Sequence, residues 1–132
     1  MIPHLTFPGE EITRRFLDWA VELALDPAVT DLDGIHALGE GWVAEEALAI
    51  AVFCAVRYQD DFAAAIRAVV NHKGDSDSTG AICGNILGAW LGKEAVEAAF
   101  DLENLELRDV IEKMACQLFE AVEGPDDPYC RG

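Results

Sequence analysis

A glycine recurs at every fourth position near the middle of the chain, at Gly80, Gly84, Gly88 and Gly92. Residues four apart lie on the same face of an α-helix, so this spacing predicts a helix with one face of very small side chains. Each glycine inside a helix costs about 1 kcal/mol relative to alanine. We interpret Gly84, Gly88 and Gly92 as sites where a neighbouring helix packs closely. Gly80 follows a group of acidic residues and could serve either packing or a bound ion.

Helical periodicity dominates the rest of the chain as well. Apolar residues keep spacings of three and four, and no segment shows the alternation of a β-strand. The expected helices cover residues 10–25, 44–58, 62–70, 78–91, 93–100 and 105–120. The glycine-containing residues 27–41 are expected to form a loop, and residues 121–132 a flexible tail. We therefore predict an all-α fold in which residues 1–132 form a single helical bundle-like domain.

The charge of the chain restricts its partners. Twenty-five acidic and nine basic residues give a formal net charge of −16 at pH 7. A phosphate-binding surface needs clustered lysine and arginine, so we expect no nucleic acid partner and no anionic membrane partner. The sequence has no signal-peptide pattern and no apolar run of membrane-spanning length, which favours a cytoplasmic protein. None of its four cysteines forms a C-x-x-C pair, and we interpret them as reduced thiols.

Oxygen-bearing side chains precede the glycines, in the segment GDSDST at residues 74–79. Two carboxylates two positions apart in an irregular turn can converge on one point, and hard cations such as Mg²⁺ prefer oxygen ligands. A simpler interpretation is that Asp77 and the two hydroxyl residues after it only cap the following helix. An EF-hand calcium loop beginning at Asp75 is excluded, because its twelfth position would be Ile86 instead of glutamate. A cation site and a helix cap both remain open.

Two segments resemble a known family. Residues 68–92, AVVNHKGDSDSTGAICGNILGAWLG, resemble the C-terminal signature of the ADP-ribosylglycohydrolases, which include the dinitrogenase-reductase-activating glycohydrolase. Family members carry an Ala-Val-Asn-like stretch, a Gly-Asp-x-Asp-Thr/Ser core and a helix rich in glycine and alanine. Residues 38–56, LGEGWVAEEALAIAVFCAV, are similar to the Gly-x-Gly-aromatic turn and acidic, alanine-rich helix that come before that core.

The resemblance implies an all-α fold around a two-metal centre, usually of Mg²⁺ or Mn²⁺. The implied reaction is hydrolysis of the bond between ADP-ribose and a modified acceptor, so the implied partner is an ADP-ribosylated substrate or ADP-ribose. Carried over by residue, it makes Asp75, Asp77 and Ser78 metal ligands, with Asp77 as the candidate bridging carboxylate.

The same resemblance places the turn at residues 39–42 near the substrate. Gly39, Gly41 and Trp42 are therefore candidate substrate-binding residues. For Trp42, we favour a core or lid position over direct contact with the substrate. We interpret the two glutamates at residues 45–46 as first-turn helix carboxylates rather than catalysts.

Other motifs of the family are missing from the sequence. Family members are longer, and their N-terminal part carries a Gly-Asp-x-x-Gly-like segment and a Thr-Asp-Asp-Thr-like run. Those supply the remaining metal ligands and the acid–base carboxylate, and neither occurs here. We therefore expect this chain to carry only the C-terminal half of the two-metal site. No catalytic residue is assigned, and whether the chain alone is an enzyme stays open.

Three hypotheses follow. The chain is part of an ADP-ribosylglycohydrolase completed by a separate N-terminal half or by self-association, and then it should expose a large apolar surface. Alternatively, it binds metal or ADP-ribose without turnover and has a closed surface. In the third hypothesis it is a helical interaction module whose Asp75–Ser78 segment only caps a helix, with the two aspartates paired inside the protein. We adopt the first.

Overall fold

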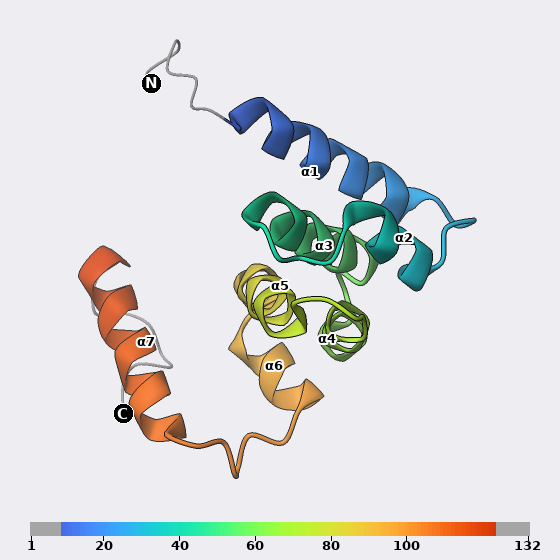
Figure 1. Ribbon diagram of the computed structural model, residues 1–132. Helices are drawn as coiled ribbons and strands as arrows, with labels where there is room; N and C mark the ends of the chain where they lie inside the picture. Colours follow the sequence, from blue (N-terminus) through green and yellow to red (C-terminus); the bar gives the residue numbers. More distant parts are fainter. Residues whose placement is uncertain (1–8, 124–132) are drawn as a thin grey trace. The chain divides into compact units, whose positions relative to one another are not determined.

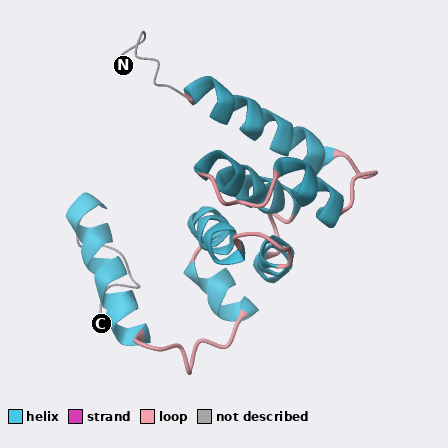
Figure 2. Ribbon diagram, in the orientation of Figure 1, coloured by secondary structure: helices cyan, strands magenta, loops and turns pink. Residues whose placement is uncertain are grey.

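The structure of the protein is a computed structural model that describes residues 9–123. Within this range the chain forms helices joined by loops and contains no strand (Figure 2). The helices are α1 (Glu10–Leu25), α2 (Asp31–Leu38), α3 (Ala44–Arg57), α4 (Phe62–Val70), α5 (Ser76–Leu91), α6 (Lys93–Ala99) and α7 (Arg108–Glu123) (Figure 1). None of them is long and apolar enough to cross a membrane. The predicted all-α fold is confirmed.

The helix that carries the glycines begins earlier than predicted. α5 starts at Ser76 rather than at residue 78. Its N-cap is Asp75, whose Oδ1 accepts a hydrogen bond from the backbone N–H of Ser78 at 3.3 Å. The predicted cap of Asp77 and the hydroxyl residues is therefore replaced by an aspartate that lies just before the helix. An aspartate at this position satisfies one of the backbone donors that a helix leaves without a partner.

The C-terminal helix is displaced along the chain relative to the prediction. α7 ends at Glu123 instead of residue 120, so residues 121–123 of the expected flexible tail are helical, and residues 124–132 lie outside the described range. No residue of α7 is buried. Its exposed apolar side chains are those of Val110, Ile111, Met114, Leu118, Phe119 and Val122.

Residues 27–41 were expected to form a loop, and this prediction is wrong for α2. Thr30 caps that helix, because its Oγ1 accepts a hydrogen bond from the N–H of Asp33 at 3.1 Å. Gly34 does not interrupt the helix but is buried against α3. A Cβ at this glycine would lie 2.3 Å from Cζ of Phe53. The glycine therefore permits a close approach of two helices where the sequence suggested a turn.

The chain divides into two compact units, of which the first ends at Ala99 and the second begins at Phe100. In the first unit, α3 is central and packs against α1, α2, α4 and α5 (Figure 1). α6 packs against α4 and α5. The buried core of this unit consists of Ala20, Ala24, Ile35, Leu38, Ala49, Ile50, Ala51, Phe53, Cys54, Ala55, Ala65, Val69, Cys83 and Leu87. Because many of these side chains are small, neighbouring helices can approach α3 closely.

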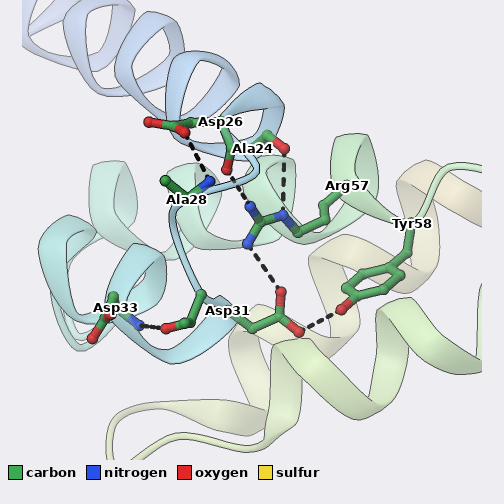
Figure 3. A network of polar contacts seen from close by, with 8 residues as sticks. Ala24, Asp26, Ala28, Asp31, Asp33, Arg57 and Tyr58 are labelled. Carbon is green, nitrogen blue, oxygen red and sulfur yellow. Dashed lines mark hydrogen bonds and ion pairs between the residues drawn. The ribbon is translucent and has the colours of Figure 1, made fainter.

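Polar contacts fix the C-terminal end of α3 to the connection between α1 and α2 (Figure 3). Arg57 donates from Nε to the carbonyl of Ala24 at 3.3 Å and from Nη2 to that of Asp26 at 2.7 Å. Its Nη1 lies 3.1 Å from Oδ1 of Asp31. The hydroxyl of Tyr58 donates to Oδ2 of the same aspartate, and this hydrogen bond raises the pKa of the tyrosine. The Arg57 side chain is only 14% exposed, so this ion pair is less screened than a surface pair.

The close-packing interpretation of the glycines holds at only one end of α5. A Cβ at Gly80 would lie 2.8 Å from Cγ1 of Val70, and one at Gly84 would be in ordinary contact with α4 at 3.8 Å. Among the described residues, nothing lies within 4 Å of the corresponding position at Gly88 or Gly92. The packing interpretation is therefore wrong for these two glycines.

An apolar groove of about 480 Å³ lies between α3 and α5. Its lining residues are Val52, Ala55, Val56, Gln59, Ile86, Leu87, Ala89 and Trp90. Trp90 is 68% exposed and Ile86 is also exposed. The groove therefore leaves apolar side chains of α3 and α5 accessible within the first unit.

The cysteines follow the prediction in part. Cys54 and Cys83 are free and buried, as expected of reduced core thiols. Burial raises the pKa of both thiols, that of Cys83 to about 11, so neither is a reactive thiolate at neutral pH. Cys116 is disulfide-bonded, contrary to the interpretation of all four as reduced.

Candidate functional site

The turn before α3 and the loop before α5 meet through their backbones. The N–H of Asp75 donates to the carbonyl oxygen of Glu40 at 2.8 Å. A Cβ at Gly74 would lie only 1.8 Å from that oxygen. Because the obstacle is backbone and cannot turn aside, only glycine fits here. The two segments that carry the predicted site residues are therefore joined at one point, although they lie far apart in the sequence.

Glu46, in the first turn of α3, holds the preceding turn in shape. Its Oε1 accepts hydrogen bonds from the backbone N–H groups of Glu40 and Gly41, both at 3.2 Å. At Gly39, where φ is +124°, a Cβ would lie 2.5 Å from Cδ of this glutamate. We interpreted Glu46 only as a first-turn carboxylate. A signal for its further role was present in the sequence, because a first-turn glutamate can reach back to the N–H groups of the residues before its helix.

Gly41 is buried and faces the start of α5. Its φ is +82°, a conformation that favours glycine. A Cβ at this position would lie 3.0 Å from Cγ2 of Thr79 and 3.6 Å from the carbonyl oxygen of Asp75. Of the three predicted substrate-binding residues, Gly39 and Gly41 thus shape the turn and bring its backbone against the predicted metal ligands.

Trp42, the third of these residues, is 66% exposed. Its Nε1 donates to Oε2 of Glu40 at 3.0 Å, which orients the indole next to the turn. The core position that we considered for this tryptophan is therefore wrong. Its large aromatic surface remains accessible to solvent beside the turn.

A chain of hydrogen bonds supports the loop before α5; the sequence did not single out His72, and it suggested Thr79 only as a helix cap. The N–H of Gly74 donates to Nδ1 of His72 at 3.0 Å, which assigns the ring proton to Nε2. Nε2 lies 3.0 Å from Oγ1 of the buried Thr79. The threonine hydroxyl in turn lies 2.9 Å from the carbonyl oxygen of Val69, to which it donates. These bonds tie the end of α4 to the first turn of α5 and fix the loop between them.

Asp75, Asp77 and Ser78 lie together at the start of α5. Oδ1 of each aspartate accepts from the same backbone N–H, that of Ser78, at 3.3 and 3.1 Å. Contact with the Asp77 carboxyl, and then the hydrogen bonds from Ser78, lower the pKa of Asp75 below its ordinary value. Within residues 9–123, neither carboxylate forms an ion pair with lysine or arginine. The three predicted metal ligands are adjacent, and one of them is also the helix cap.

Comparison with known proteins decides the family. A model of the ADP-ribosylglycohydrolase family matches residues 2–128, almost the whole chain. The chain belongs to the ADP-ribosylglycohydrolase family. The match extends beyond both segments in which the sequence showed the resemblance. No curated protein and no solved structure matches the chain.

ADP-ribosylglycohydrolases are generally metal-dependent. The residues present here fit a hard cation in part, because two adjacent carboxylates and a serine hydroxyl offer oxygen donors. In the described part of the chain, no group of three or more histidine, cysteine, aspartate or glutamate side chains could hold a metal. The two adjacent carboxylates are thus fewer than the ligands that a complete two-metal centre needs.

Proposed function

We propose that this chain carries the C-terminal half of the metal site of an ADP-ribosylglycohydrolase. In that role it would take part in hydrolysis of an N- or O-glycosidic bond of ADP-ribose. The observation that carries the proposal is the backbone junction between Glu40 and Gly74–Asp75. It brings the predicted substrate turn against the predicted metal ligands, which neither helix capping nor core packing requires.

Each part of the junction has a role in this proposal. Asp75, Asp77 and Ser78 would hold Mg²⁺ or Mn²⁺, which when bound orients ribose hydroxyls and activates water. Gly39 and Gly41 keep the turn free of side chains, so that a ligand can approach its backbone. The exposed ring of Trp42 offers a flat surface on which a base or a ribose can stack.

The ligand set also supports the view that the site is incomplete. Mg²⁺ prefers six oxygen ligands, some of them water, and two carboxylates with one hydroxyl would hold it weakly. We therefore propose that further ligands come from a separate N-terminal half or from self-association. The exposed groove between α3 and α5 supports this arrangement, because a self-sufficient protein seldom leaves such a surface open.

Calorimetric titration with Mn²⁺ and then ADP-ribose tests the proposal. Asp77→Ala is the informative variant, because Asp75 rather than Asp77 is the N-cap and the helix keeps its start. Asp33→Ala is a matched control, since this residue is also an acidic first-turn residue, in α2. We expect saturable Mn²⁺ binding that Asp77→Ala abolishes and Asp33→Ala preserves. Identical titrations for all three proteins would contradict a metal site at Asp77.

The alternative is a non-catalytic helical binding or interaction module in which Asp75–Ser78 only caps a helix. The hydrogen bond from the Ser78 N–H to Asp75 favours it, because that cap is present. It predicts no Mn²⁺ binding by any variant. A hydrolysis assay with ADP-ribosylated arginine and serine peptides then separates an active enzyme from a protein that binds ADP-ribose without turnover.

A further inference from the structure

A small pocket lies between α2 and the loop that joins α4 to α5. Its volume is about 340 Å³, within the range of small-molecule sites. The lining residues are Leu32, His36, Val70, Asn71, His72 and Lys73. No carboxylate lines it, in a chain with twenty-five acidic and nine basic residues. The pocket is thus a local exception to the acidic character of the protein.

Three side chains of this pocket can donate hydrogen bonds to a ligand. Those of His36, Asn71 and Lys73 make no hydrogen bond or ion pair with other residues in the range 9–123. By contrast, many other basic side chains are paired with carboxylates. These are Arg14, Arg15, Arg57, Lys93 and Arg108. The donors of the pocket therefore lack the carboxylate partners that these five basic side chains have.

His72 forms a fixed wall of the pocket rather than a ligand. Both ring nitrogens are occupied, Nδ1 by the N–H of Gly74 and Nε2 by the hydroxyl of Thr79. The same bonds hold Asn71 and Lys73 in a loop that leads directly to Asp75. A molecule in the pocket would therefore lie against the same loop as the candidate metal ligands.

We propose that this pocket binds the phosphate groups of a nucleoside diphosphate. An ammonium, an imidazole and an amide are the donors that phosphate oxygens accept, and charge-assisted hydrogen bonds of this kind are among the strong ones. The proposal goes beyond the proposed function, because it needs no divalent cation. If ADP-ribose is the substrate, the pocket assigns a place to its diphosphate.

The C-terminal ends of α2 and α4 provide a competing explanation. Helix C-termini carry a partial negative charge and favour basic side chains. α2 ends at Leu38 and α4 ends at Val70, so His36 and Lys73 lie near two such ends. In that case the basic side chains would serve the helices and the pocket would have no ligand.

Titration of the whole chain with ADP and with inorganic pyrophosphate, in EDTA, separates the two explanations. The test variant is Lys73→Gln, and the matched control is Arg67→Gln. Arg67 is an exposed basic residue of α4 that does not line the pocket, so both variants remove one positive charge. We expect Lys73→Gln to weaken binding of ADP about tenfold, as for loss of one charge-assisted hydrogen bond, and Arg67→Gln to change it about twofold or less.

Each outcome decides the matter. Tighter binding of ADP than of pyrophosphate supports a nucleotide as the source of the phosphates, and equal binding supports a free phosphate compound in the same pocket. Equal weakening by both variants, or no binding of either compound, overturns the proposal. EDTA removes divalent cations, so this titration does not depend on the candidate metal site. A negative result for this pocket can therefore be distinguished from a negative result for the metal site.

Discussion

The two halves of α5 carry glycines at the same spacing, yet their surroundings differ. In the N-terminal half, Gly80 lies close to the side chain of Val70, and the buried Thr79 is hydrogen-bonded to His72 and to the end of α4. In the C-terminal half, no described residue lies within 4 Å of where a Cβ at Gly88 would stand. A repeated glycine therefore does not mean repeated packing, because each position depends on what the rest of the fold brings to it.

The two halves of α5 also border different parts of the molecule. The N-terminal end of α5 meets the turn before α3 and assembles the candidate metal site. The C-terminal end borders the apolar groove and exposes Trp90. One helix thus has the closely packed junction of two loops at its N-terminal end and an exposed apolar surface at its C-terminal end. Substitutions at the two ends should have opposite effects on stability.

Gly74→Ala should give the largest effect, at the junction itself. The added Cβ would meet the carbonyl oxygen of Glu40 at 1.8 Å, so one of the two loops must move and their hydrogen bond must break. We expect a loss of about 3 kcal/mol of unfolding free energy, at the upper end for an overpacked site, and loss of Mn²⁺ binding. Urea denaturation and calorimetry measure the two effects. Wild-type stability in this variant would mean that the loops do not meet as described.

Glu46→Ala should have the next largest effect. It removes the acceptor of two backbone hydrogen bonds, from Glu40 and Gly41, and leaves these N–H groups to water. We expect a loss of about 1 kcal/mol of unfolding free energy. We also expect ADP-ribose binding to be weakened more than Mn²⁺ binding, because the substrate turn loosens while the metal ligands stay in place. Glu45→Ala, one position earlier in the same helix turn, is the control. Equal losses from the two variants would show that only first-turn charge matters.

The sequence predicted what depends on local periodicity and missed what depends on contacts across the fold. Apolar spacing located α1, α3 and α4 nearly to the residue, because an amphipathic pattern is a property of the helix itself. It missed α2, where Gly34 reads as a turn residue until the ring of Phe53 is known to lie against it.

The same division applies to the candidate site. The carboxylates and the Gly-x-Gly turn were visible in the sequence, and the family match covers the segments that carry them. The bond between Glu40 and Asp75 could not be predicted, because no local pattern shows which loops will meet. Nor could the chain of His72 and Thr79, since a lone histidine and a threonine near a helix start have many possible partners.

Gly88→Ala should have a small effect of the opposite sign. Alanine is the better helix former, and a Cβ here meets no described residue. We expect a gain of about 0.5–1 kcal/mol in unfolding free energy. Gly80→Ala should gain less or lose, because its Cβ would lie 2.8 Å from Cγ1 of Val70. Both are measured by urea denaturation, and a ranking in which Gly80→Ala is the more stable variant would reverse the comparison of the two halves.

Asp75→Asn should change stability least, and only over part of the pH range. Contact with Asp77 and the hydrogen bonds from Ser78 lower the pKa of Asp75 in the folded protein, so the ionised form is favoured by folding. Its contribution is present above the pKa of the unfolded chain, about 4, and is lost as pH falls through the lower folded-state value. Asparagine caps a helix about as well but cannot ionise, so variant and wild type should differ at pH 6 and converge in acid, once the pH is below the lowered folded-state pKa of Asp75. Unfolding midpoints in urea across this range measure the difference. A difference in unfolding midpoint that persists in acid would have to come from the geometry of the cap. The charge of Asp75 would then contribute nothing to stability.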